Sequence, residues 1–304
     1  MIIDIKTFES VLHSSIRNNK FHDFLLKFKH VLKDHDSGGM LDWYFWKIGD
    51  QSLGTSTTCH TTRSDNAPEY IPRNLFFYFD KNLPDDIKNV IDSQNAQGKF
   101  SVVLFDKLQS RDFLKKNYGD DCLRLFDGLR HPSEESDFMR YHVVNYYGGY
   151  WSDADEMLNQ DYFLNYLSNL PPTEILLAQS QKHGNGCHGP LQSCFFGATK
   201  GHPIVQGAID LLYINCINTP NLSIWKKTGP GPITRSFINY YLERAINQNL
   251  DSSNFSSLAS DAMISVIGKH ELRKFLTGFV PSYRGDERDW RVFESISNKK
   301  EKGD

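Results

Sequence analysis

The sequence has no long apolar run and no leader-like start. Its longest uninterrupted apolar stretches, such as Leu75 to Phe79 and Val102 to Phe105, are about five residues long, against about 20 needed to span a bilayer. Residues 1–8 carry Asp4 and Lys6 and lack the apolar stretch of a secretory signal. We therefore expect no membrane-spanning segment and a cytoplasmic protein, with secretion by a route without a signal peptide left open.

The chain also lacks paired cysteines and an excess of either charge. Its five cysteines are an odd number with no CxxC pair, which is a poor framework for zinc or for disulfides. The 34 Lys and Arg against 37 Asp and Glu leave a net charge of −3, with a pI near 6.4. No global positive field is present to hold a polyanion, so we expect no nucleic-acid partner.

What the sequence does contain is typical of a globular protein. Of its 304 residues, 39% are hydrophobic, 13% aromatic and 23% charged. This composition excludes fibrous and disordered classes, and the length suits one large or two ordinary domains.

Apolar residues between Phe21 and Leu32 recur at helical spacing among lysines, which predicts an amphipathic helix. We favour a helical layer packed on the main domain over a basic helix in weak contact with an anionic membrane surface. The Ser/Thr-rich residues 51–66 have no period and indicate a connector. We expect an N-terminal helical region with its connector over residues 1–66 and the main domain over residues 67–304.

Beyond the connector, short apolar stretches alternate with helical patterns, which predicts an α/β fold. Strands are expected at Ile71 to Phe79, Lys99 to Phe105 and Glu174 to Gln179. Helices are expected from Pro84 to Ile91, near Pro203 to Tyr213 and from Ile233 to about Ala245, because proline suits the start of a helix.

The most informative segment begins with a further predicted helix. It runs from Ser136, a candidate N-cap, to Tyr147, and the glycine pair that begins at Gly148 would end it. Asp137 and Arg140 are three residues apart and so lie on one helical face.

Two carboxylates, Asp153 and Asp155, follow the glycine pair. In an extended segment they would point the same way. Two hard oxygen donors after a tight turn suit Mg²⁺ or Mn²⁺ held partly by substrate phosphates. Residues 157 and 158 do not suit an EF-hand, and the surroundings of Asp153 do not suit an aspartyl-phosphate phosphatase.

Four segments of the chain resemble the DXD-containing glycosyltransferases. They are the motif SDFMRYHVVNYYGGYWSDAD, the stretch IPRNLFFYF followed by NLPDDI, and the segments FFGATKGHPIV and TGPGPIT. The chain resembles the Och1-like group, which is also called the sugar-binding-region family. It also resembles the related clostridial toxin-type glucosyltransferases. The resemblance spans about residues 70–235.

The resemblance implies a GT-A-type fold with a Rossmann-like nucleotide-binding sheet flanked by helices. It also implies Mn²⁺ or Mg²⁺ as cofactor, a UDP- or GDP-sugar as donor, and transfer of a hexose to an acceptor hydroxyl with retention of configuration. The acceptor could be a glycan, a lipid or a protein. A metal-dependent phosphotransferase using the same aspartates, and a sugar-nucleotide-binding module with a decayed site, remain as alternatives.

The resemblance also suggests roles for single residues. Asp155 is expected as the direct metal ligand, with Asp153 reaching donor hydroxyls and the metal; these two form the expected catalytic pair. Asp137 and Arg140 are expected to hold the donor sugar.

Three aromatic residues are candidates for contact with the donor. Phe79 and Trp151 would either stack against its base or pack in the hydrophobic core, and Trp290 would belong to a lid that closes over it. Many relatives complete the metal site shortly before a tryptophan near the C-terminus. Here the stretch before Trp290 lacks that ligand, and Asp289 could approach the cation in its place.

Overall fold

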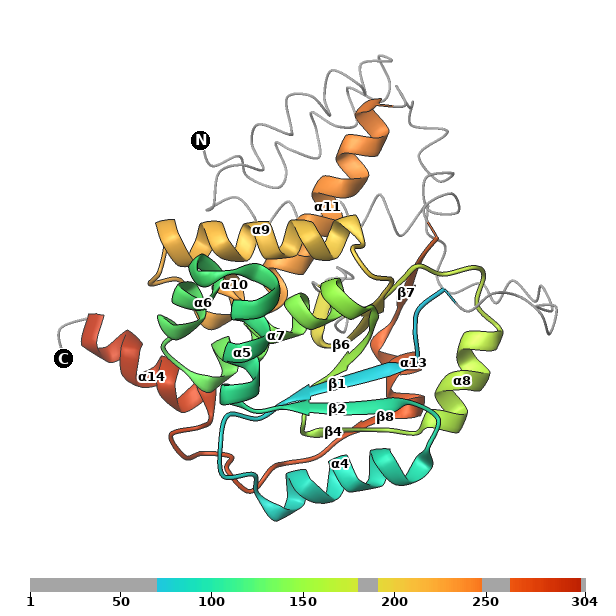
Figure 1. Cartoon of the computed structure of the whole chain (residues 1–304), viewed down its shortest axis with the longest axis horizontal. Helices are drawn as coiled ribbons and strands as arrows, with labels where there is room; N and C mark the ends of the chain where they lie inside the picture. Colours follow the sequence, from blue (N-terminus) through green and yellow to red (C-terminus); the bar gives the residue numbers. More distant parts are fainter. Residues whose placement is uncertain (1–69, 180–190, 248–262, 302–304) are drawn as a thin grey trace.

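The computed structural model describes residues 70–179, 191–247 and 263–301 (Figure 1). The strands of this part are β1 (Asn74–Tyr78), β2 (Ser101–Phe105), β3 (Gly149–Ser152), β4 (Glu156–Leu158), β5 (Ile175–Gln179), β6 (Leu191–Ala198), β7 (Ile264–Ile267) and β8 (Leu276–Gly278). Its helices are α4 (Asp85–Gln97), α5 (Lys107–Tyr118), α6 (Asp120–Asp127), α7 (Pro132–Tyr147), α8 (Gln160–Ser168), α9 (Pro203–Asn218), α10 (Ile224–Lys227), α11 (Pro230–Asn247), α13 (Lys269–Phe275) and α14 (Trp290–Glu301).

In this part of the chain, a six-stranded sheet has the order β2-β1-β3-β6-β5-β7, and β4 pairs with β8 in a small second sheet. Strands β2, β1 and β3 are parallel to one another, β6 is antiparallel to both β3 and β5, and β7 is parallel to β5. The predicted α/β class, a central sheet flanked by helices, is confirmed.

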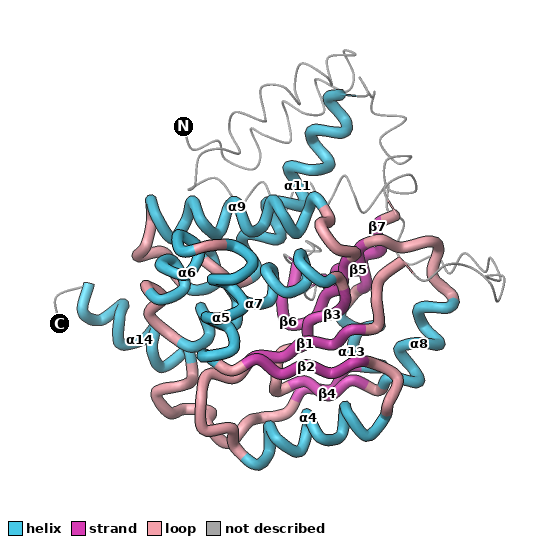
Figure 2. Tube along the Cα trace, viewed as in Figure 1, coloured by secondary structure: helices cyan, strands magenta, loops and turns pink. Residues whose placement is uncertain are grey.

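Helices cover both faces of the central sheet (Figure 2). Phe76 and Tyr78 of β1 point into the core beneath α5, α6, α7, α9 and α11, whereas Leu75 and Phe77 point into the core beneath α4, α8 and α13. This alternation is the period of two that a strand buried on both faces must satisfy.

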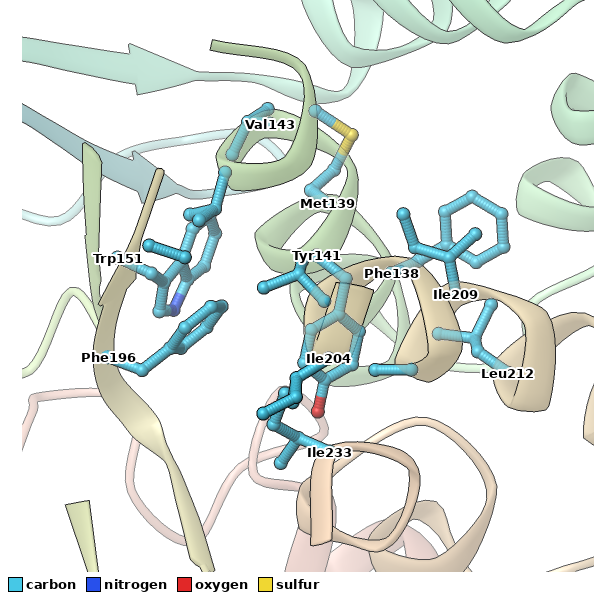
Figure 3. Packing of buried hydrophobic residues seen from close by; sticks show 14 of the residues in the cluster. Phe138, Met139, Tyr141, Val143, Trp151, Phe196, Ile204, Ile209, Leu212 and Ile233 are labelled. Carbon is cyan, nitrogen blue, oxygen red and sulfur yellow. The ribbon is translucent and has the colours of Figure 1, made fainter. Parts of the chain in front are cut away.

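Aromatic side chains fill the first of these cores. Figure 3 shows Trp151 of β3 and Phe196 of β6 facing Tyr141 of α7, all of them fully buried. Each large side chain removed from water contributes about 1.5 to 3 kcal/mol. Helix α7 is therefore held against the sheet along its length, which fixes the functional side chains it carries.

A glycine pair joins α7 to β3. Gly148 (φ +70°) ends the helix, and Gly149 (φ +128°) begins the strand. A Cβ on Gly149 would lie 2.7 Å from both the Cβ and the carbonyl oxygen of Asn74 in β1. Only glycine lets the chain turn this tightly and still pair β3 with β1.

The structure confirms the predicted strands and moves the starts of two helices. Helix α7 begins at Pro132, and its N-cap is His131, whose Nδ1 accepts the Ser133 N–H at 3.1 Å. The prediction of Ser136 as N-cap was wrong because proline at the first helical position starts the helix one turn earlier. Similarly, α11 begins at Pro230 and includes the Gly-Pro run as its first turn.

The predicted N-terminal region, residues 1–66, lies outside the described residues. Over the ranges given above, none of the helices combines the length and the apolar character that crossing a bilayer requires.

We predict that Gly149→Ala lowers the free energy of unfolding by roughly 2 to 4 kcal/mol, because it adds both an unfavourable φ and a clash with Asn74. Gly128→Ala is the matched control, since Gly128 has negative φ (−85°) and an added methyl group there would meet its neighbours at ordinary contact distances. Urea unfolding followed by circular dichroism measures both. Equal stability of the two variants would contradict the strained-turn interpretation.

Candidate active site at the carboxyl end of the sheet

A cavity of about 480 Å³ opens where β1 and β3 end. Parallel strands end at the same edge of a sheet, and ligands of open α/β folds bind there. Five segments contribute to the wall of this cavity. They are the residues after β1 (Phe79, Asp80), the first turns of α7 (Ser136, Asp137, Arg140), the turn after β3 (Asp153, Asp155), the α10–α11 junction (Trp225, Gly229) and the segment before and at the start of α14 (Tyr283, Arg284, Asp289, Trp290).

The Arg140 guanidinium is the centre of this wall. Its Nη2 lies 2.7 Å from Asp137 Oδ1 and 3.2 Å from Asp153 Oδ1, and its Nη1 donates to the Ser193 carbonyl at 2.5 Å. The guanidinium is buried, yet Asp153 and Asp137 raise its pKa against the opposing effect of burial. Arg140 therefore ties α7 to the turn after β3 and to β6.

Asp137 is held on both of its oxygens. Its Oδ2 accepts the Thr228 hydroxyl at 2.8 Å while Oδ1 faces Arg140. Burial raises the pKa of Asp137, and Arg140 and Thr228 oppose that rise. The predicted pairing on one helical face is confirmed, and the pair lies in the cavity wall, not on a solvated surface.

Trp151 lies beneath the cavity and is absent from its lining. Its ring is fully buried, and its Nε1 donates to Asp153 Oδ1 at 2.9 Å. The Arg140 guanidinium lies 5.4 Å from the ring centroid. Trp151 was expected either to stack against the donor base or to lie in the core. The structure places it in the core, from which it orients Asp153.

The segment carrying the two aspartates is a turn, which corrects the expected extended conformation. The Asp153 N–H donates to the Cys194 carbonyl at 2.8 Å, and the Glu156 N–H returns to the Asp153 carbonyl at 3.0 Å. The chain must turn here because β3 ends at Ser152 and β4 starts at Glu156 in a separate sheet. Asp153 and Asp155 nevertheless line the same cavity.

Asp155 lies in an electrostatically unfavourable position. Burial, and then the nearby charges of Asp153 and Glu156, raise its pKa to about 7, although Arg284 opposes this from 3.5 Å. Two adjacent carboxylates with too little positive charge between them fit a divalent cation with oxygen ligands. No group of three or more His, Cys, Asp or Glu in the described ranges could hold a metal, so water and substrate oxygens would complete the coordination.

The segment before α14 contributes Asp289 and Trp290. Asp289 Oδ2 accepts the Gly285 N–H at 3.0 Å, and Oδ1 accepts the Arg291 N–H at 3.1 Å. Both oxygens thus stabilise the start of α14, and its role as a cation ligand stays a prediction. Trp290 is half-buried in the cavity wall, with the Arg291 guanidinium 4.6 Å from its ring centroid.

Phe79 lines the cavity and packs edge-on against Tyr283, with ring centroids 5.8 Å apart. Its predicted role as a base platform stays a prediction. Sequence reasoning assigned no role to Asp80 or Tyr283, which both line the cavity. Asp80 could have been found, because a polar residue directly after a buried strand lies at the edge where ligands bind.

Residues 81–176 match a family described as "Glycosyltransferase sugar-binding region containing DXD motif". None of the curated proteins matches. Among the solved structures, one named "PaToxG Glycosyltransferase" is similar over 83% of this chain and 94% of its own, at 16% identity and a TM-score of 0.40.

The matched residues include Asp137, Arg140, Asp153 and Asp155, the charged group at the centre of the cavity. The resemblance inferred from the sequence is thereby confirmed. Over residues 81–176 the chain is therefore similar to the DXD-containing sugar-binding region of glycosyltransferases.

The raised pKa of Asp155 has a consequence for stability. Between its ordinary pKa of 3.8 and about 7, the unfolded chain releases this proton first, so the free energy of unfolding falls as pH rises through that window. We predict that in EDTA, Asp155→Asn is more stable than wild type at pH 8, by about 1 to 3 kcal/mol, and that the difference shrinks at pH 5.

Thermal unfolding at the two pH values measures this effect. Asp92→Asn, which removes an exposed carboxylate of α4, is the control and should show no such pH dependence. If Asp155→Asn were destabilising at pH 8, the carboxylate would be favourably paired and the electrostatic description of the site would be wrong.

Proposed function

We propose that this glycosyltransferase moves a hexose from a nucleotide-diphosphate sugar to an acceptor hydroxyl, that it needs Mn²⁺ or Mg²⁺, and that it retains anomeric configuration. The observation that carries the proposal is the buried Arg140 joined to Asp137 and Asp153, with Asp155 beside them in one cavity. Its volume of about 480 Å³ lies within the range of small-molecule sites. Retention is implied by the family resemblance.

Asp153 and Asp155 are the residues that would hold the cation. When bound, the cation offsets the negative charge that grows on the departing nucleoside diphosphate. Arg284, 3.5 Å from Asp155, is placed to pair with a phosphate oxygen once Asp155 has another partner. Phe79 and Trp290 would contact the donor from two further parts of the wall.

Asp137 would contact the donor sugar directly, and Arg140 would hold Asp137 in position. Each Asp137 oxygen accepts one bond from the protein and retains capacity for a sugar hydroxyl. The Arg140 Nη1 and Nη2 groups are engaged by Ser193, Asp137 and Asp153. Arg140 is therefore chiefly a positioning residue, which fixes two carboxylates relative to each other.

A donor-hydrolysis screen over UDP- and GDP-sugars tests the proposed function. We predict turnover with Mn²⁺ or Mg²⁺, its loss in excess EDTA, and at least a hundredfold loss in Asp155→Asn, because a charge and a hard ligand leave the site. Asp92→Asn should keep wild-type activity. Normal turnover in EDTA or in Asp155→Asn would refute the metal assignment, and hydrolysis of phosphomonoesters instead of sugar nucleotides would refute glycosyl transfer.

We further predict that Arg140→Lys lowers kcat/KM at least tenfold, mainly through kcat, while the protein stays folded. An ammonium group keeps the charge but loses the planar fork that meets Asp137 and Asp153 together. Arg140→Ala is a poor probe because it leaves buried carboxylates unpaired, at a cost of about 3 to 5 kcal/mol. Arg111→Lys, at a surface pair with Asp127, is the matched control. Unchanged kinetics in Arg140→Lys would show that the charge alone suffices.

A further inference from the structure

We infer that Asp80 recognises the base of the donor and that this base is guanine. The inference rests on the proposed use of a nucleotide sugar and goes beyond it, by choosing among nucleotides.

Asp80 is a fixed part of the cavity wall. It comes two residues after the end of β1, directly after Phe79, and both residues line the cavity. The Phe79 N–H donates to the Phe105 carbonyl at 3.0 Å, and the Asp80 carbonyl accepts the Lys107 N–H at 3.3 Å. These bonds hold the backbone of both residues to the end of β2 and the start of α5.

Phe79 lies on the same cavity wall as residues proposed to meet the diphosphate. Phe79 packs against Tyr283, and the next residue, Arg284, pairs with Asp155. A flat ring resting on Phe79 would thus lie on the same wall as the residues proposed to meet the diphosphate. Aromatic side chains offer a face on which any base can stack, so Phe79 alone selects none of them.

In the described ranges no cationic side chain forms a close ion pair with the Asp80 carboxylate, and Lys81 and Arg288 interact with it only at longer range. Burial raises the pKa of Asp80, and a bond from the Lys81 N–H opposes the rise. The nearby Glu135 is already engaged by the Tyr78 hydroxyl and by Lys107, whose Nζ lies 2.5 Å from it. A half-buried carboxylate in this state favours a ligand that brings N–H donors.

Guanine matches this requirement better than the other bases. It presents two adjacent donors, N1–H and the exocyclic amine, which two carboxylate oxygens can accept together. Uracil presents one N–H between two carbonyl oxygens, which a carboxylate would oppose. Adenine and cytosine each present an amine beside a ring acceptor. A site that binds a donor pair rejects ligands that lack it, because its own polar atoms are then left unpaired.

The ribose hydroxyls are the competing partner for Asp80. They would donate hydrogen bonds to its carboxylate whichever base the nucleotide carries. The family resemblance assigns donor hydroxyls to Asp153, which Trp151 and Arg140 orient on the neighbouring strand end. Asp80 is thereby left for the base.

Calorimetric titration of the full chain with GDP, IDP, XDP and UDP, in Mn²⁺, tests the inference. We expect GDP to bind at least tenfold tighter than UDP, and IDP to bind more weakly than GDP because it lacks the exocyclic amine. Asp80→Asn should reduce GDP affinity at least tenfold and raise XDP affinity, because an amide supplies one donor and one acceptor. The gain for XDP shows that the variant is folded, and Asp92→Asn should reproduce the wild-type order.

The other outcomes overturn the inference in distinct ways. Tighter binding of UDP than of GDP, with donor hydrolysis intact, would refute guanine recognition and leave the proposed function standing. Equal loss of GDP and UDP in Asp80→Asn would assign Asp80 to the ribose. A preference for GDP that survives Asp80→Asn would show that another residue selects the base. Binding of none of the four nucleotides would refute the proposed function itself.

Discussion

The buried Arg140 guanidinium is the interaction on which the site depends. It joins residues from α7, from the turn after β3 and from β6, which are distant in the sequence. A buried cation is tolerated only when carboxylates and carbonyls surround it. The sequence must therefore supply Asp137 and Asp153 together, and the fold must bring them to one place. The geometry of the two carboxylates follows from this single cation.

The sheet brings these elements together. Parallel pairing of β1 with β3 aligns their carboxyl ends, and the glycine pair before β3 allows α7 to return to that same edge. Trp151 connects the hydrophobic core to the site, because its ring packs in the core and its N–H orients Asp153. Packing and site geometry are in this way set by the same side chains.

Much of this fold could be predicted from the sequence, because strand alternation, proline at helix starts and glycine at helix ends are local signals. The face shared by Asp137 and Arg140 was also local and was predicted correctly. The contact of Arg140 with Asp153 could not be predicted, since it depends on how β3 lies against α7. Nor could the turn at Asp153, which exists because β4 leaves the central sheet. The same limit applies to Trp151. A tryptophan at this position suits either a stacking platform or the hydrophobic core, and only the packing of the fold determines which.

The charges of the site are not fully balanced within the protein. Arg140 compensates for Asp137 and part of Asp153, but Asp155 remains with Arg284 at 3.5 Å and with a raised pKa. An unbalanced carboxylate in a half-buried wall lowers the stability of the ligand-free protein. The two cores beneath the helices, rich in fully buried Phe, Tyr and Trp, offset that cost. An uncompensated carboxylate also retains affinity for a cation, which a fully neutralised wall would lack.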